Sequence, residues 1–178
     1  KGTSANITFT NYFQNTLTVS GKSHTGLFCN TMEKGTSLTA TLEKEEGSGA
    51  ISVTAASSSA DAGGFVGHMD SGILKISGSS VETVTSENGN AGGLVGSANG
   101  GKIELKQEEG MATSFKFADL LELSAGEEYA AGGLIGAYTF SEDFGGDTTV
   151  NQNKQYEYNL SGYQFHKITI SGGKNAGG

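Results

Sequence analysis

The side chains that could do chemistry in this chain are three histidines and a single cysteine. His24, His68 and His166 have no second histidine at the spacing of a helical zinc-binding motif, so we expect turn or surface residues and no metal site. Cys29 has no partner for an internal disulfide and no adjacent His or Lys to lower its pKa. We therefore expect Cys29 to be a small buried residue and not a reactive thiol.

The acidic side chains gather in short runs and do not form the paired pattern of a glycosidase. The runs cover residues 43–46, 108–109 and 127–128, and the chain has no Arg to accompany them. The carboxylates within 142–147 flank a Gly-Gly pair, but their spacing matches neither an EF-hand loop nor a calcium-binding β-roll repeat. We expect no catalytic residue, no metal and no cofactor, and a polysaccharide-acting enzyme is the least favoured alternative.

The composition excludes two classes of partner. Glycine accounts for 29 of the 178 residues, Pro, Trp and Arg are absent, and the formal net charge is -8. Nucleic acid is excluded because phosphate binding needs clustered Lys and Arg. No apolar run approaches the roughly 18 residues of a membrane span, so we expect a soluble piece without membrane insertion. With no initiator Met and no signal peptide, we interpret the chain as a fragment of a longer repeat array.

A glycine-rich motif recurs along the chain and organises it. Its clearest form is Ala-Gly-Gly-Leu-Val-Gly at 91–96. Self-similarity at a period of roughly 20 to 50 residues is the signature of a stacked repeat. The last Gly before the apolar pair falls at 26, 64, 93, 133 and 178, so the steps are 38, 29, 40 and 45 residues. The copies lie at 25–29, 62–67, 91–96, 131–136 and 176–178.

Short alternating apolar runs lie on both sides of each motif. Alternation at period two places one face of a β-strand inward. The runs before the motifs are at 17–19, 51–53, 81–84, 121–123 and 168–170. The runs after the motifs are at 38–42, 73–76 and 102–105, with counterparts at 7–9 and 156–160.

Strands joined by turns and never by helices predict an all-β fold, a parallel β-helix or β-solenoid with about three short strands per coil. Four to five irregular coils would stack, and the excess length would leave them as loop insertions. Neighbouring repeats would be one another's partners, because no single repeat buries a core alone. We expect one β-solenoid fragment over 1–178, with approximate coils 1–26, 27–64, 65–93, 94–133 and 134–178.

The recurring glycines have a structural explanation. A turn that enters a narrow coil needs positive φ or a close backbone approach, and Gly supplies both. A phosphate-binding loop would need a following helix and usually a Lys, and neither appears. In the first copy, Cys29 stands where the last glycine stands in the other copies. The structural glycines are Gly63, Gly64, Gly67, Gly92, Gly93, Gly96, Gly132, Gly133 and Gly136.

Aromatic residues are concentrated in two insertions between the strands. They offer large contact area at low entropic cost and can form a binding patch, but they can equally pack the insertion against the coil. Both interpretations stay open at this point. The candidates are Phe115 and Phe117 within 111–118, and Tyr138, Phe140, Phe144, Tyr156, Tyr158 and Tyr163 within 138–163.

The Ala-Gly-Gly-apolar-apolar-Gly motif at 62–67, 91–96 and 131–136 resembles the GLUG repeat. That family occurs in large secreted or wall-attached bacterial proteins, including some IgA-specific metallopeptidases and many adhesin-like proteins of gut bacteria. The resemblance covers the whole chain at the level of the repeat, and it implies an extracellular location at the bacterial cell surface or cell wall. The copy at 25–29 lacks one Gly on each side of its apolar pair, so we expect a wider or partly open first coil.

The repeat and its aromatic insertions favour a non-enzymatic binding or adhesion module. The resemblance implies a ligand on the host, either a surface protein such as an immunoglobulin or a mucin glycan. The alternative is structural, a spacer or self-stacking filament segment, because the open ends of a β-helix are unpaired edges.

Overall fold

The computed structural model describes residues 3–106, 115–118, 121–138, 168–171 and 175–177. All regular structure in these residues is β-strand, and no helix occurs among them. The described part accordingly holds no apolar helix of the length that a membrane span needs. The prediction of an all-β protein is confirmed.

The strands form four sheets, called A to D here, and every pairing between the strands is parallel. Sheet A consists of β1 (Ser4–Asn11), β5 (Ser37–Lys44), β9 (Ile73–Gly78) and β13 (Lys102–Leu105). Sheet B consists of β2 (Leu17–Gly21), β6 (Ile51–Ser58), β10 (Thr83–Asn88), β14 (Leu121–Ser124) and β17 (Ile168–Ser171). Sheet C consists of β3 (Thr25–Gly26), β7 (Ala62–Gly63), β11 (Ala91–Gly92), β15 (Ala130–Gly132) and β18 (Asn175–Gly177). Sheet D consists of β4 (Cys29–Met32), β8 (Val66–Met69), β12 (Val95–Ala98) and β16 (Ile135–Tyr138).

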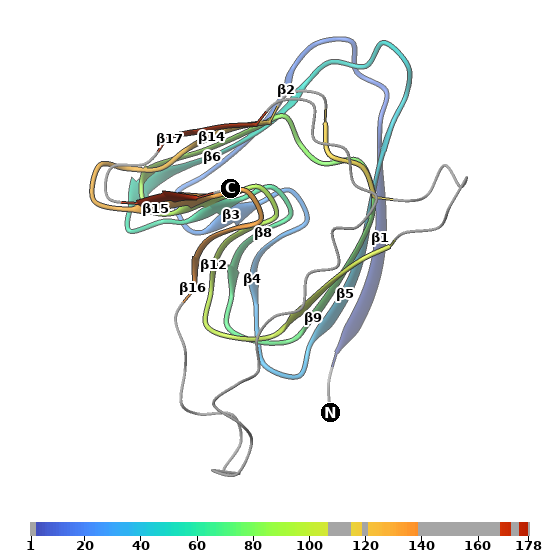
Figure 1. Cartoon of the computed structure of the whole chain (residues 1–178). Helices are drawn as coiled ribbons and strands as arrows, with labels where there is room; N and C mark the ends of the chain where they lie inside the picture. Colours follow the sequence, from blue (N-terminus) through green and yellow to red (C-terminus); the bar gives the residue numbers. More distant parts are fainter. Residues whose placement is uncertain (1–2, 107–114, 119–120, 139–167, 172–174, 178) are drawn as a thin grey trace.

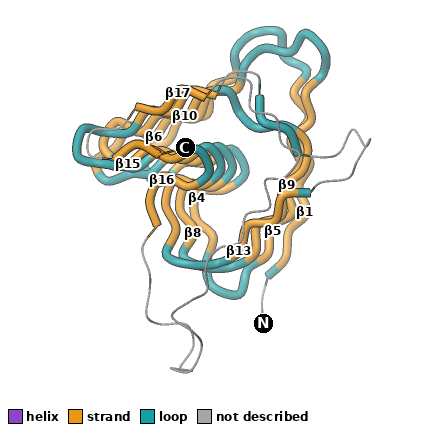
Figure 2. Tube along the Cα trace, viewed as in Figure 1, coloured by secondary structure: helices purple, strands orange, loops and turns teal. Residues whose placement is uncertain are grey.

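The chain visits the four sheets in a fixed order and then begins again. One pass contributes a strand to A, then B, then C, then D, so the first pass is β1 to β4 and the second is β5 to β8. Within each sheet a strand pairs with its counterpart from the next pass. Figures 1 and 2 show successive passes following nearly the same path, with sheets B and C one above the other and sheet A along the opposite side.

The strands of sheets A and B form where the sequence alternates between apolar and polar residues. In β5, Leu38, Ala40 and Leu42 are buried while the residues between them reach the surface. The predicted runs before the motifs lie in sheet B and those after the motifs lie in sheet A, as expected. The predicted run at 81–84 is shifted, since β10 begins at Thr83. The run at 156–160 lies outside the described residues.

The glycine motif contributes two strands and not one. In the second pass, β7 ends at Gly63 and β8 begins at Val66, with a bend between them. A Cβ on Gly63 would clash with the carbonyl oxygen of Val66, so only Gly fits this bend. The expectation of about three strands per repeat is therefore wrong, because the chain turns in the middle of the motif.

The pairing register corrects the alignment of the first motif copy. Gly26 pairs with Gly63, and Gly63 with Gly92, so the first interval is 37 residues and not 38. Cys29 pairs with Val66, which means that it occupies the place of the first apolar strand residue of sheet D and not that of Gly67. The alignment by sequence was wrong because Leu27 stands where the second copy has Gly64, so the last Gly before the apolar pair is not the same position in the two copies.

The core lies between the sheets and is continuous through the passes. Phe65 and Leu94, one after each glycine pair, are fully buried, as are Val66 and Val95. The corresponding pair in the fourth pass, Leu134 and Ile135, is only partly buried. The apolar pairs of the motif thus supply core side chains.

Candidate functional site

Two columns of side chains flank the glycine motif, one at sheet C and one at sheet D. The residue that precedes each sheet C strand is His24, Asp61 or Asn90 in the first three passes. The third residue of each sheet D strand is Thr31, His68, Ser97 or Ala137, and these pair in register. We call the place where these two columns meet the junction.

The junction is offset by one pass. A Cβ on Gly67 would clash with the backbone at Thr25 and His24, and a Cβ on Gly96 would clash with the backbone of Ala62. Each sheet D strand therefore packs against the sheet C strand of the preceding pass, backbone to backbone. Because of this offset, His68 of the second pass meets His24 of the first, and Ser97 of the third pass meets Asp61.

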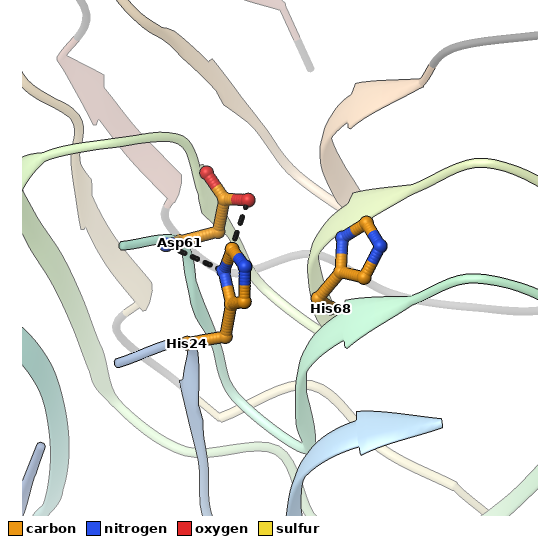
Figure 3. Close-up of side chains that lie close together, drawn as sticks. All are labelled: His24, Asp61 and His68. Atoms are coloured by element: carbon orange, nitrogen blue, oxygen red, sulfur yellow. Dashed lines mark hydrogen bonds and ion pairs between the residues drawn. The ribbon is translucent and has the colours of Figure 1, made fainter. Parts of the chain in front are cut away.

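The two imidazole rings stack across the junction. The ring centroids of His24 and His68 lie 4.9 Å apart with an interplanar angle of 28°. His24 Nδ1 accepts a hydrogen bond from the backbone N–H of Asp61 at 3.1 Å and lies 3.3 Å from Asp61 Oδ2. Figure 3 shows the carboxylate of Asp61 above the His24 ring, with His68 across from them.

Asp61 is the centre of a hydrogen-bond network. Its side chain is 9% exposed. Oδ1 accepts two hydrogen bonds from Asn90, one from the backbone N–H and one from the side-chain amide, both at 2.8 Å. Oδ2 accepts a hydrogen bond from the hydroxyl of Ser97. These donors satisfy a carboxylate that would otherwise be costly to bury.

His68 is held in one orientation by polar neighbours on sheet D. Its Nδ1 lies 2.7 Å from Ser97 Oγ, and the side-chain amide of Asn99 lies 3.4 Å from its Nε2. Because the Asn99 amide donates to Nε2 and Ser97 donates to Asp61, we assign the proton of neutral His68 to Nδ1. Burial lowers the pKa of His68 below its usual 6.5, and the neighbouring His24 lowers it further.

The order of these hydrogen bonds does not activate a nucleophile. In a serine hydrolase the hydroxyl donates to the imidazole, and the imidazole donates to the carboxylate. Here the hydroxyl of Ser97 lies between His68 and Asp61 and donates directly to the carboxylate. The arrangement offers two imidazoles and a carboxylate as ligands. Neither imidazole accepts the proton of the Ser97 hydroxyl.

This cluster could not be predicted from residue spacing, because its members come from three distant positions in the chain. His24 and His68 were expected to be isolated turn or surface residues, yet His68 lies within β8 and both reach Asp61. The available signal was the alignment of His24, Asp61 and Asn90 at the same place before successive motif copies. His166 lies outside the described residues.

The structure describes three of the aromatic candidates, and two of them are core residues. Phe115 is 1% exposed and Phe117 is 6% exposed. Their rings pack edge to face at 4.9 Å, and Phe115 also packs edge to face on Phe65. The binding interpretation of Phe115 and Phe117 is therefore wrong, and the packing alternative holds. Tyr138 is partly buried against the core, and Phe140, Phe144, Tyr156, Tyr158 and Tyr163 lie outside the described residues.

The motif glycines act by close approach and not by positive φ. Gly63 faces the Val66 carbonyl, and Gly92 faces the Val95 carbonyl in the same way. Within the described part, the glycines with positive φ are at other places. A Cβ would meet a backbone atom in the same way at six other motif glycines, which are Gly64, Gly67, Gly93, Gly96, Gly132 and Gly136.

Cys29 is partly buried at the start of β4. Burial raises the pKa of its thiol to about 11. A thiol of this kind stays protonated at neutral pH and is a poor nucleophile, which agrees with the expectation of an unreactive cysteine.

Comparison of the chain with protein-family models, with curated proteins and with solved structures finds no match. The resemblance to the GLUG repeat stays a prediction from the motif itself.

Proposed function

We propose that the chain is a segment of a parallel β-helix that acts as a non-enzymatic binding module of a bacterial surface protein. Support for the β-helix comes from the fixed order of the four sheets and from the in-register parallel pairing of each strand with its counterpart in the next pass. Each coil would then contain four strands, and sheets A to D would be its sides. A β-helix offers flat, extended sides, and these are the surfaces that such proteins use for binding.

The observation that carries the binding function is a regular polar face on the outside of sheet B. Two outward positions on each strand form two columns across the five strands. All these residues are exposed or partly exposed, and all but Glu122 carry a hydroxyl group. The first column is Thr18, Ser52, Thr83, Glu122 and Thr169, and the second is Ser20, Thr54, Thr85, Ser124 and Ser171.

The spacing of this polar face suits a ligand with repeated hydroxyl groups. Neighbouring strands lie about 4.8 Å apart, and alternate residues of one strand lie about 6.6 Å apart, so the hydroxyls form a grid. The two columns contain no aromatic side chain, Met or Arg, whereas protein–protein interfaces are enriched in these residues. We therefore favour a mucin-type glycan over an immunoglobulin as the ligand of this face.

The test is binding of mucin glycans and of serum immunoglobulin to the immobilised chain. The variant Thr54→Val with Thr85→Val removes two hydroxyls from the centre of the polar face without changing side-chain volume much. We expect glycan affinity to fall about tenfold or more, because each lost hydrogen bond costs about 1 kcal/mol. The matched control, Thr8→Val with Thr39→Val on sheet A, should bind as the wild type does.

Two results would contradict the proposal. The first is a folded chain that retains neither glycan nor immunoglobulin. The second is an equal loss of affinity in the sheet B variant and in the sheet A control. Retention of immunoglobulin alone, reduced by the sheet B variant, would keep the binding function and replace the glycan with a protein ligand.

A structural role is the second candidate, and the edge of sheet A favours it. Strand β1 pairs only with β5 among the described strands, so no described strand pairs with its other edge, which is eight residues long. Ile7 on this strand is 41% exposed, and Tyr12 and Phe13 just after it are 70% and 58% exposed. An unpaired edge with apolar side chains favours pairing with another strand. A second copy of the chain could supply that strand and extend the stack.

Sedimentation velocity over a wide concentration range tests the stacking role. Self-association that grows with concentration, and that Ile7→Lys reduces, would support it, since edge lysines oppose strand pairing. A chain that stays monomeric at every concentration would count against it. The same substitution should leave ligand binding at sheet B unchanged.

A further inference from the structure

The cluster of His24, Asp61 and His68 has the composition of a metal site. Each residue offers one ligand atom, and these three atoms all lie within 4.8 Å of one another. The three side chains come from just before β3, just before β7 and within β8, so two successive passes contribute to the cluster. Figure 3 shows the His68 ring across from the His24 ring and the Asp61 carboxylate.

We propose that His24, Asp61 and His68 bind a divalent transition-metal ion of the zinc class. Zinc is bound by imidazole nitrogen and carboxylate oxygen, and three protein ligands leave a fourth position for water. Calcium and magnesium take mainly oxygen ligands, so a set with two imidazoles selects against them. The site goes beyond the proposed ligand-binding function and does not depend on it.

The ligand atoms must move together to bind the ion. Atoms bound to a tetrahedral zinc at 2.0–2.1 Å lie roughly 3.3 Å from one another. The spacing of up to 4.8 Å must therefore contract. His24 is the residue that can move, because its side chain is 34% exposed. Its Nδ1 contacts only Asp61 among the described hydrogen-bond partners, and Asp61 is itself a proposed ligand. Rotation about its side-chain bonds would bring the ring toward the other two ligands.

Asp61 and His68 form the fixed part of the site. Asn90 donates two hydrogen bonds to Asp61 Oδ1 and leaves Oδ2 facing the histidines. Polar partners of this kind orient metal ligands and increase affinity. Ser97, which bridges Oδ2 and His68 Nδ1, would have to move aside or rotate as the ion enters. The proton of His68 would move from Nδ1 to Nε2, because a protonated ring nitrogen cannot bind the ion. The hydrogen bonds of Ser97 to Asp61 Oδ2 and to His68 Nδ1 are then replaced by metal–ligand bonds.

Metal binding would link the first pass of the chain to the second. His24 precedes the strand of sheet C in the first pass, whereas Asp61 and His68 flank the glycine motif of the second. An ion that binds the folded but not the unfolded chain raises the melting temperature in proportion to the logarithm of its concentration. The site would thus stabilise the passes nearest the amino-terminal end.

Isothermal titration of the chain with zinc chloride tests the proposal, with calcium chloride as the comparison. We expect one zinc site, and affinity about tenfold or more lower in His24→Ala and in His68→Ala. The matched control is His166→Ala, which removes the remaining histidine and should bind zinc as the wild type does. Circular dichroism establishes that each variant is folded.

Three results would overturn the proposal. They are the absence of zinc binding by the folded wild type, an equal loss in His166→Ala, and calcium binding as tight as zinc binding. Long-range ¹H–¹⁵N spectra of the wild type keep the test decisive if a variant fails to fold. Zinc should shift the ring nitrogens of His24 and His68 and leave those of His166 in place, and the opposite pattern would exclude this site.

Discussion

The two ends of the junction share one glycine per sheet C strand but not the residues that flank it. In the first three passes, the flanking columns carry His24, Asp61 and Asn90 at sheet C, with His68 and Ser97 at sheet D. In the fourth pass, the corresponding residues are Ala130 and Ala137. The backbone pairing is the same at both ends, since Gly26 pairs with Gly63 at one end and Gly92 pairs with Gly132 at the other. The glycine motif thus determines the backbone of the junction, and the flanking positions can hold different side chains in different passes.

Substitution of a shared glycine should disrupt the junction most. A Cβ on Gly92 would clash with the backbone carbonyl of Val95, which cannot move without breaking the bend. We expect Gly92→Ala to destabilise the fold by about 3 kcal/mol or more. Urea unfolding measures the change. The control is Gly47→Ala, where φ is 79° and no atom lies within 4 Å, so the expected cost is only the left-handed backbone penalty of about 1 to 2 kcal/mol.

Truncation of the apolar residue after the glycine pair should destabilise the third pass more than the fourth. Leu94 is fully buried, whereas Leu134 in the fourth pass is only partly buried. We expect Leu94→Ala to cost about 2 to 5 kcal/mol, and Leu134→Ala to cost less because less contact is lost. Thermal unfolding of both variants gives the comparison. Equal losses would mean that the fourth pass is packed as tightly as the third.

The polar network should stabilise the amino-terminal end of the junction by a smaller amount. Asp61→Ala removes the acceptor of two Asn90 hydrogen bonds and one from Ser97. We expect a loss of about 1 to 3 kcal/mol, because donors are left unpaired in a mostly buried site. The control is Asp70→Ala, an exposed carboxylate that should change stability by less than about 0.5 kcal/mol. A similar cost for both would show that the network contributes little.

The smallest expected effect is a pH dependence that comes from His68. In the folded protein its pKa lies below the usual 6.5, so the unfolded chain binds the proton more readily. The stability that neutral His68 contributes is complete above the unfolded-state pKa, which is the usual 6.5. The free energy of unfolding falls as the pH is lowered from there through the folded-state pKa. In the presence of a chelator, His68→Gln should remove this part of the decline between about pH 7 and 5, and His166→Gln should retain it. An unchanged profile in His68→Gln would assign the decline to other groups.

Much of the fold could be predicted because periodicity and repetition are local in the sequence. The alternation in 38–42 and 51–53 located the strands of sheets A and B correctly. The division of the motif into two strands could not be predicted, because it depends on the contact between Gly63 and the Val66 carbonyl. Counting glycines also misplaced Cys29 by one residue, since the first copy carries one Gly where the others carry two.

The candidate site could not be predicted from the spacing of its residues in the sequence. His24 and His68 are 44 residues apart, and their contact depends on the offset of one pass between sheets C and D. Ligand spacing within one helix or loop gives no hint of such a contact. The reverse error concerned Phe115 and Phe117, where aromatic residues in an insertion suggested a surface patch and the rings instead fill the core.

A designed disulfide tests whether each strand pairs in register with its counterpart from the next pass. In a Cys29→Ser background, Ser52→Cys with Thr83→Cys places two thiols on paired neighbours of sheet B. Their Cα atoms would lie about 4.8 Å apart, within disulfide range. The control, Ser52→Cys with Glu122→Cys, spans two strands and about 9.6 Å, which a disulfide cannot bridge. In-register pairing predicts an intramolecular cross-link in the first pair alone. Peptide mass spectrometry detects it after mild oxidation of the folded chain. No cross-link in the first pair, or one that forms as readily in the second, would contradict it.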